Sequence, residues 1–190
     1  LVNSYVQASG MRVLDGNILG YLPQELGETD KEKTVYEYYC HRPAFFDRTP
    51  KDIAQIAGQL SLPSDFCYGE QPIGLLSGGE KVKLQLARIL MENPDILLLD
   101  EPSNDIDIET LQWLEQFINQ ASMPILFVSH DESLIENTAN VVIHLERLMR
   151  GRTVRHTVAR LPYQDYIAQR LANLDKQTQL AQNEEREHQK

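Results

Sequence analysis

Several features are missing from the sequence, and each absence narrows what the chain can be. No apolar run approaches the roughly 20 residues needed to span a bilayer, so we expect a soluble chain with no membrane insertion. The two cysteines, Cys40 and Cys67, have no metal-ligand spacing and form no dense framework, which suits a reducing compartment. Together these absences favour a cytoplasmic location.

Positive charge is also scarce. The 190 residues include 18 Lys and Arg against 28 Asp and Glu, a formal net charge of −10. Such a balance argues against nucleic-acid binding by bulk electrostatics and leaves room only for a local basic patch. The first residue is Leu1, and the residues after it do not resemble a signal peptide, so we interpret it as an internal start and expect a fragment.

A glycine-rich phosphate loop is absent as well, because no segment matches G-x-x-x-x-G-K-[ST]. The segment Ser77-Gly78-Gly79-Glu80 has two interpretations, a helix cap and a phosphate-binding site. Ser77 can cap the following helix and Glu80 can reciprocate, which satisfies backbone amides without any ligand. The two glycines, however, remove side chains that would keep a phosphate from a helix N-terminus, where anions are favoured.

The strand that follows favours the phosphate-binding interpretation. Ile96–Asp100 is apolar on both faces, as a strand buried in a parallel sheet must be. Asp100 stands where the strand ends, the position from which α/β sheets present ligand-binding groups, and we expect it to bind magnesium. Glu101 would orient or deprotonate a water that attacks a phosphate. The alternative is an acidic pair in a surface turn.

Four further residues occupy comparable positions. His130 closes strand Ile125–Ser129, so its imidazole would reach the edge of the terminal phosphate. Gln24 follows the first strand and is expected to contact magnesium or water and to couple the site to a helical insertion. Asp105 and Asp107 either contact a partner domain or cap the next helix, and the sequence leaves both alternatives open.

The apolar periodicity predicts an α/β fold. Strands and helices are expected to alternate and to wind into a parallel sheet through right-handed crossovers. The expected strands are Ile18–Leu22, Ile96–Asp100, Ile125–Val128 and Val141–Leu145, and the expected helices are about 80–91, 108–119 and 133–137.

Two other regions have a helical pattern. A small helical insertion is expected at about 31–68, beginning with a capping box at Thr34 and Glu37. Residues 176–190 are nearly all polar and helix-favouring, with Leu180 as the one large apolar side chain. Such a helix must project into solvent or pack against another structural element.

These motifs resemble a known family. Leu76–Glu80 and Ile96–Pro102 resemble the signature loop and Walker B strand of the ATP-binding cassette (ABC) ATPases. From Gln24 to about Tyr166 the chain resembles a nucleotide-binding domain of the ABC-F subfamily, whose members join two such domains by a long helical linker and act on ribosomes.

Three segments favour that subfamily. The signature continues as Lys-x-Lys-Leu-x-Leu-Ala-Arg over residues 81–88. Residues 103–107 read Ser-Asn-Asp-Ile-Asp and resemble the subfamily's Thr-Asn-His-Leu-Asp, although Asp105 replaces the usual His. Tyr163-x-x-Tyr166-x-x-x-Arg170 resembles the end of the first ABC-F domain, where the linker begins.

The resemblance implies an incomplete P-loop ATPase domain over residues 1–160, lacking its Walker A portion, and the start of an interdomain linker helix over 161–190. ATP and Mg²⁺ are the implied cofactors. The implied catalytic residues are Glu101 and His130, and the implied metal ligands are Asp100 and Gln24. Nucleotide binding is implied for Ser77, Gly78, Gly79, Glu80 and Gln24. Contact with a partner domain is implied for Asp105 and Asp107.

The implied partners are a second ABC domain of the same parent and the ribosome, with its rRNA and tRNA. The intact parent would hydrolyse ATP, as a housekeeping translation factor or as an antibiotic-resistance protein, whereas the fragment alone is expected to be inactive. Two alternatives stay open, a nucleotide-binding subunit of a membrane ABC transporter and a DNA-repair ABC ATPase.

Overall fold

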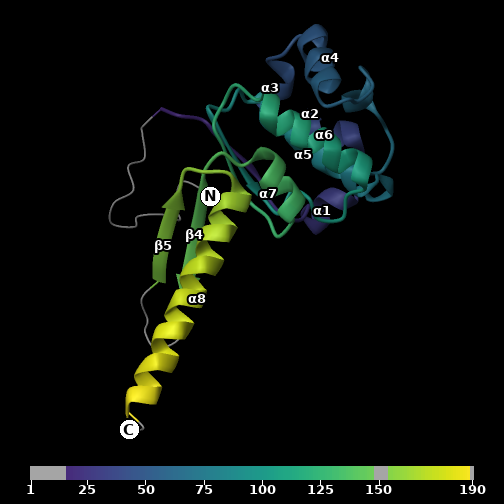
Figure 1. Ribbon diagram of the computed structural model, residues 1–190. Coiled ribbons are helices and arrows are strands. Elements are labelled where there is room, and N and C mark those ends of the chain that lie inside the picture. Colours follow the sequence, from purple (N-terminus) through teal and green to yellow (C-terminus); the bar gives the residue numbers. More distant parts are fainter. Residues whose placement is uncertain (1–15, 148–153, 189–190) are drawn as a thin grey trace. The chain divides into compact units, whose positions relative to one another are not determined.

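The computed structural model describes residues 16–147 and 154–188, and the chain divides into two compact units, Leu1–His130 and Asp131–Lys190 (Figure 1). The first unit contains a parallel sheet, its flanking helices and a helical insertion. The described residues of the second form an antiparallel strand pair and two helices. Within the described ranges, no helix has both the length and the apolar character that a membrane crossing requires.

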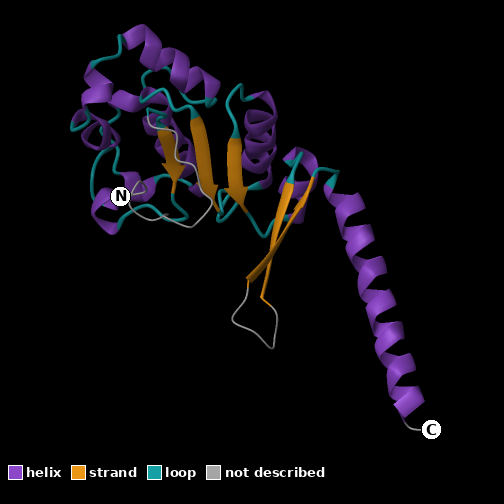
Figure 2. Ribbon diagram, turned by 90° about the vertical axis from the view of Figure 1, so that its left-hand side faces the viewer, coloured by secondary structure: helices purple, strands orange, loops and turns teal. Residues whose placement is uncertain are grey.

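The sheet of the first unit confirms the α/β class. Its three strands are β1 (Leu19–Leu22), β2 (Ile96–Asp100) and β3 (Ile125–Val128), all parallel and in the order β1-β2-β3 (Figure 2). In the central strand Leu97 and Leu99 are fully buried on one face, while the other face is half-buried. The carboxyl ends of the three strands therefore meet at one edge of the sheet.

Two long helices accompany the sheet. α5 (Gly78–Met91) ends just before Asn93-Pro94, since proline cannot continue a helix, and α6 (Ile108–Gln120) begins at an aspartate cap. α5 packs closely on β1: a Cβ on Gly20 would lie 2.3 Å from a methyl carbon of Ile89. Glycine at that position allows the helix and the strand to approach each other.

The helical insertion is present, as the sequence predicts. It comprises α1 (Glu28–Lys31), α2 (Val35–Cys40), α3 (Pro43–Phe46), α4 (Pro50–Gln59) and the short 3₁₀ turns η2 (Phe66–Tyr68) and η3 (Ile73–Leu75). The predicted capping box at Thr34 and Glu37 is present, and Thr49 and Asp52 form a second one that the sequence analysis missed. The hydroxyl of buried Tyr39 donates to the carbonyl of Leu84 at 2.8 Å, which ties α2 to α5.

The second unit contains α7 (Glu132–Thr138), β4 (Val142–Arg147), β5 (Val154–Ala159) and α8 (Tyr163–His188). The predicted placement of the strand near Val141 in the parallel sheet is wrong, because β4 pairs antiparallel with β5. Hydrophobic periodicity does not predict β5, because its centre, Arg-His-Thr, is polar. α8 confirms the predicted helix as far as His188, and the last two residues lie outside the described ranges.

Candidate functional site

Glu101 leaves the end of β2 in an unusual conformation. Its φ of 47° lies in the left-handed region, which is uncommon for a residue other than glycine. Its backbone N–H donates to the carbonyl of Val128 at 2.9 Å, and its own carbonyl accepts from Asn104 at 3.1 Å as the chain turns. These bonds hold a strained backbone, and such strain is concentrated at functional sites in proteins.

The carboxylate of Glu101 is held by His130. Its Oε2 accepts a hydrogen bond from the backbone N–H of His130 at 3.1 Å, and its Oε1 lies 3.3 Å from the imidazole Nε2. The Glu101 side chain is 8% exposed, whereas the His130 side chain is 96% exposed. The structure therefore brings both predicted catalytic residues together, with a buried carboxylate against an exposed imidazole.

Asp100 has a different partner, which the sequence analysis did not identify. The hydroxyl of Tyr21 on β1 donates to Asp100 Oδ2 at 3.1 Å. Burial raises the pKa of Tyr21 above its usual 10.0, and this hydrogen bond raises it further. The sequence position of Tyr21 could have indicated this contact, because Tyr21 stands near the carboxyl end of a strand that is predicted to lie in the same sheet as Asp100.

The signature segment forms the predicted capping box at the start of α5. The Ser77 hydroxyl accepts from the backbone N–H of Glu80 at 3.2 Å. In return, Glu80 Oε2 accepts from the backbone N–H and the hydroxyl of Ser77, both at 2.8 Å. The segment is thus well ordered by its own hydrogen bonds, and its contact with a phosphate stays a prediction.

The structure also gives Gly78 and Gly79 a packing role that the sequence analysis did not anticipate. A Cβ on Gly78 would lie 1.8 Å from the backbone oxygen of Asp105, and a Cβ on Gly79 would lie 2.4 Å from the hydroxyl of Thr110. Both glycines therefore allow the signature segment to pack directly on the chain that follows Glu101.

The two aspartates of this following segment differ in what they do. Asp107 is the N-cap of α6, where its carboxylate accepts from the backbone N–H of Thr110 at 2.7 Å. That hydrogen bond lowers the pKa of Asp107. Asp105 has a φ of 58° and meets Gly78 through its backbone oxygen. The capping alternative thus applies to Asp107, and a contact of either residue with a partner domain stays a prediction.

Gln24 lies exposed in the bend that follows β1. Among the described residues, the hydrogen bonds to the Asp100 and Glu101 carboxylates come from Tyr21 and His130 and none comes from Gln24. Its predicted contact with magnesium or water stays a prediction.

The acidic residues at this edge fit a magnesium ion that is shared with a nucleotide. In the described part of the chain, no group of three or more His, Cys, Asp or Glu residues could hold a metal on its own. Magnesium in nucleotide-dependent enzymes is bound by one or two carboxylates together with substrate phosphates. Asp100 carries carboxylate oxygens at the end of β2 beside Glu101, which fits that requirement, and its binding of magnesium stays a prediction.

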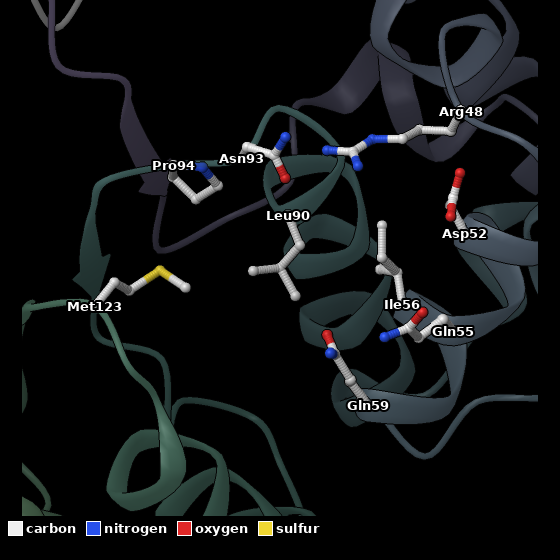
Figure 3. A pocket seen from close by; sticks show the side chains of 9 residues that line it. All are labelled: Arg48, Asp52, Gln55, Ile56, Gln59, Leu90, Asn93, Pro94 and Met123. Carbon is white, nitrogen blue, oxygen red and sulfur yellow. The ribbon is translucent and has the colours of Figure 1, made fainter.

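A cavity of about 310 Å³ lies elsewhere in the first unit (Figure 3). Pro94 and Met123, which line it, stand just before β2 and β3, so the cavity is near the amino ends of the strands whose carboxyl ends bear Asp100 and His130. On its wall, Arg48 donates twice to the carbonyl of Met91, at 3.1 and 2.9 Å. The cavity is therefore distinct from the acidic site.

A family model described as ABC transporter matches residues 6–104 of the 190. The chain belongs to this ABC family. The match includes the segments from Gln24 to Asn104, and so contains the signature and the carboxylates of Asp100 and Glu101. The predicted resemblance of Leu76–Glu80 and Ile96–Pro102 to the ABC ATPases is thereby confirmed.

Two relatives support the predicted resemblance to the ABC-F subfamily. Elongation factor 3 of Pneumocystis carinii is 32% identical over 127 residues, which are 66% of this chain and 12% of the relative. The energy-dependent translational throttle protein EttA of Mycobacterium tuberculosis is 39% identical over 103 residues, 54% of this chain and 18% of the relative. The chain thus spans less than a fifth of either relative.

Solved structures give the same fold. A structure of RNase-L Inhibitor superposes with a TM-score of 0.61 at 23% identity, covering 88% of this chain and 32% of that one. At this identity the likeness shows the fold alone. It agrees with a parallel sheet and flanking helices of the ABC type.

Proposed function

We propose that this chain is part of a cytoplasmic ABC-F ATPase that hydrolyses ATP to ADP and phosphate and acts on the ribosome. The observation that carries the proposal is the buried Glu101 carboxylate, held by His130 beside Asp100 at the carboxyl edge of the sheet. A carboxylate fixed beside a second one suits the hydrolysis of a metal-bound nucleotide.

Glu101 is the group that orients the attacking water and accepts its proton. Its side chain is buried and both oxygens are positioned by His130, so little reorganisation is needed when water binds. A general base must lie within hydrogen-bond reach of the proton it removes, and the left-handed turn after β2 places Glu101 at the open edge of the sheet.

Asp100 would hold the magnesium ion, and a bound magnesium would supply neutralisation of charge on the phosphates. His130 has two tasks. Its backbone N–H and ring nitrogen fix the Glu101 carboxylate. Its exposed imidazole would contact the edge of the terminal phosphate.

The signature segment serves a second nucleotide, which is bound mainly by the other ABC domain of the same parent. The amino end of α5 is a suitable anion site because the helix dipole is positive there and glycines occupy its first two positions. Each domain then contributes Asp100 and Glu101 to one ATP and Ser77–Glu80 to the other.

Translation is the proposed setting. Two relatives are named as an elongation factor and a translational throttle protein, and these names support a partner in the translation machinery. The acidic chain does not favour RNA by bulk charge, so the contact with ribosomal RNA and tRNA is assigned to other parts of the full-length protein. α8, a helix of 26 residues, is the start of the linker toward the second domain.

A sedimentation experiment tests the ribosome assignment. The Glu101→Gln variant of the full-length protein should bind ATP without hydrolysing it and remain in its ATP-bound state. In a sucrose gradient it should move with ribosomes when ATP is present and stay at the top without ATP. If it stays at the top in both cases and is recovered with a membrane permease, the transporter alternative is correct and the ribosome assignment fails.

A further inference from the structure

The contact between Tyr21 and Asp100 follows from the register of the sheet. Tyr21 on β1 pairs with Leu98 on β2. Side chains two residues apart along a strand share a face, so Leu98 and Asp100 lie on one face of β2. Tyr21 therefore stands on the neighbouring strand just behind Asp100, and its long side chain reaches forward to the carboxylate.

The hydrogen bond engages one oxygen of the carboxylate. Tyr21 donates to Oδ2 at 3.1 Å, and among the described residues Oδ1 receives no hydrogen bond. A tyrosine hydroxyl is both a donor and an acceptor, and because a carboxylate can only accept, the phenol is the donor in this hydrogen bond. The carboxylate is thereby fixed through one oxygen while the other is free to bind a cation.

From this geometry we propose that Tyr21 is a positioning residue that orients the Asp100 carboxylate for nucleotide-bound magnesium. The proposal rests on the proposed ATPase function and adds a residue to it. Groups that hydrogen-bond a metal ligand from behind set its orientation, and their loss typically weakens metal binding by about 10- to 100-fold. Because Tyr21 and Asp100 are only part-buried, water can replace some of the lost hydrogen bond, and we expect an effect near the lower limit.

The test compares the full-length wild type with Tyr21→Phe, which removes the hydroxyl and keeps the ring. The matched control is Tyr36→Phe, because Tyr36 is an exposed tyrosine of α2 in the helical insertion. Three quantities are measured for each protein: the Mg²⁺ concentration for half-maximal ATPase activity, the affinity for a fluorescent ATP analogue with Mg²⁺ and with EDTA, and the melting temperature.

For Tyr21→Phe we expect the half-saturating Mg²⁺ concentration to rise about tenfold. Analogue binding should weaken with limiting Mg²⁺ and match the wild type in EDTA, and the melting temperature should be unchanged. A merely structural role would weaken binding equally in both conditions. Tyr36→Phe should match the wild type throughout.

Two results would overturn the assignment while leaving the ATPase proposal intact: an unchanged Mg²⁺ dependence of both activity and analogue binding, or a loss of binding that is equal in EDTA. If Tyr21→Phe were too unstable for kinetics, its analogue binding in EDTA would be reduced because less folded protein is present. That result would count against a positioning role. A wild type without Mg²⁺-dependent ATPase activity would reject the proposed function, and the role of Tyr21 with it.

Discussion

His130 Nε2 lies 3.3 Å from Glu101 Oε1, although the imidazole is almost fully exposed and the carboxylate is buried. The carboxylate is also held by the backbone N–H of His130, which no side-chain substitution removes. A substitution of the His130 side chain therefore removes the ring contact and leaves the backbone hydrogen bond, so the two contacts can be separated experimentally.

Replacing His130 by Ala should reduce ATP hydrolysis by the full-length protein by about 10²-fold, toward the lower end of the effect of losing the base itself. The ring contact with Glu101 is lost while the backbone hydrogen bond stays, so the carboxylate is less well oriented but still present. ATP affinity should change little. Steady-state kinetics and equilibrium binding measure the two effects, and His41→Ala, an exposed histidine of the insertion, is the control. Hydrolysis that is unchanged in His130→Ala would show that the ring has no part in the reaction.

The packing of the signature glycines predicts an order of stabilities. Gly78→Ala should destabilise the fold by about 2–4 kcal/mol because the new methyl group meets a backbone oxygen that cannot move aside. Gly79→Ala should be milder, since its closest contact, at 2.4 Å, is with a side chain and not with the backbone. Gly58, in α4, has nothing within 4 Å of an added Cβ, so Gly58→Ala should stabilise by about 0.5–1 kcal/mol. Urea unfolding of the three variants measures the order, and a neutral Gly78→Ala would refute the close packing.

The cap of α6 predicts a specific dependence of stability on acid. The pKa of Asp107 is lowered from 3.8 by the hydrogen bond from Thr110, so its contribution is complete above pH 4 and is lost as the pH falls through the lower folded-state pKa. Asp107→Asn keeps a capping oxygen and removes the titration. In unfolding curves between pH 7 and pH 2, the variant should therefore lose less stability than the wild type below pH 4. Parallel loss in both proteins would contradict a titrating cap.

Much of the first unit was predictable because its signals are local. The strands β1, β2 and β3 are apolar runs that end at polar residues, and the capping boxes at Thr34 and Ser77 follow from residue types at fixed spacing. The pairing of Glu101 with His130 follows from their places at the ends of two strands of one sheet.

Other features depend on contacts that no local pattern contains. The partner of Asp100 is the hydroxyl of Tyr21, which comes from a strand 79 positions away and looks like an ordinary core aromatic. Glycine is required at position 78 because the carbonyl oxygen of Asp105 leaves no room for a side chain, and the position of that carbonyl depends on the turn after Glu101. β5 has a polar centre and pairs with β4 alone in the described part of the chain, so its pairing could not be read from hydrophobic periodicity.

The central claim, that Glu101 performs the hydrolytic step, is tested most directly by single-turnover hydrolysis in the full-length protein with its second ATP site disabled. Glu101→Gln keeps the size and the hydrogen-bonding capacity of the side chain and removes the base, and Glu92→Gln, at the exposed end of α5, is the matched control. Hydrolysis by Glu101→Gln should fall by about 10²–10⁴-fold while ATP affinity is retained, and Glu92→Gln should behave as the wild type. Turnover by Glu101→Gln at the wild-type rate would contradict the account.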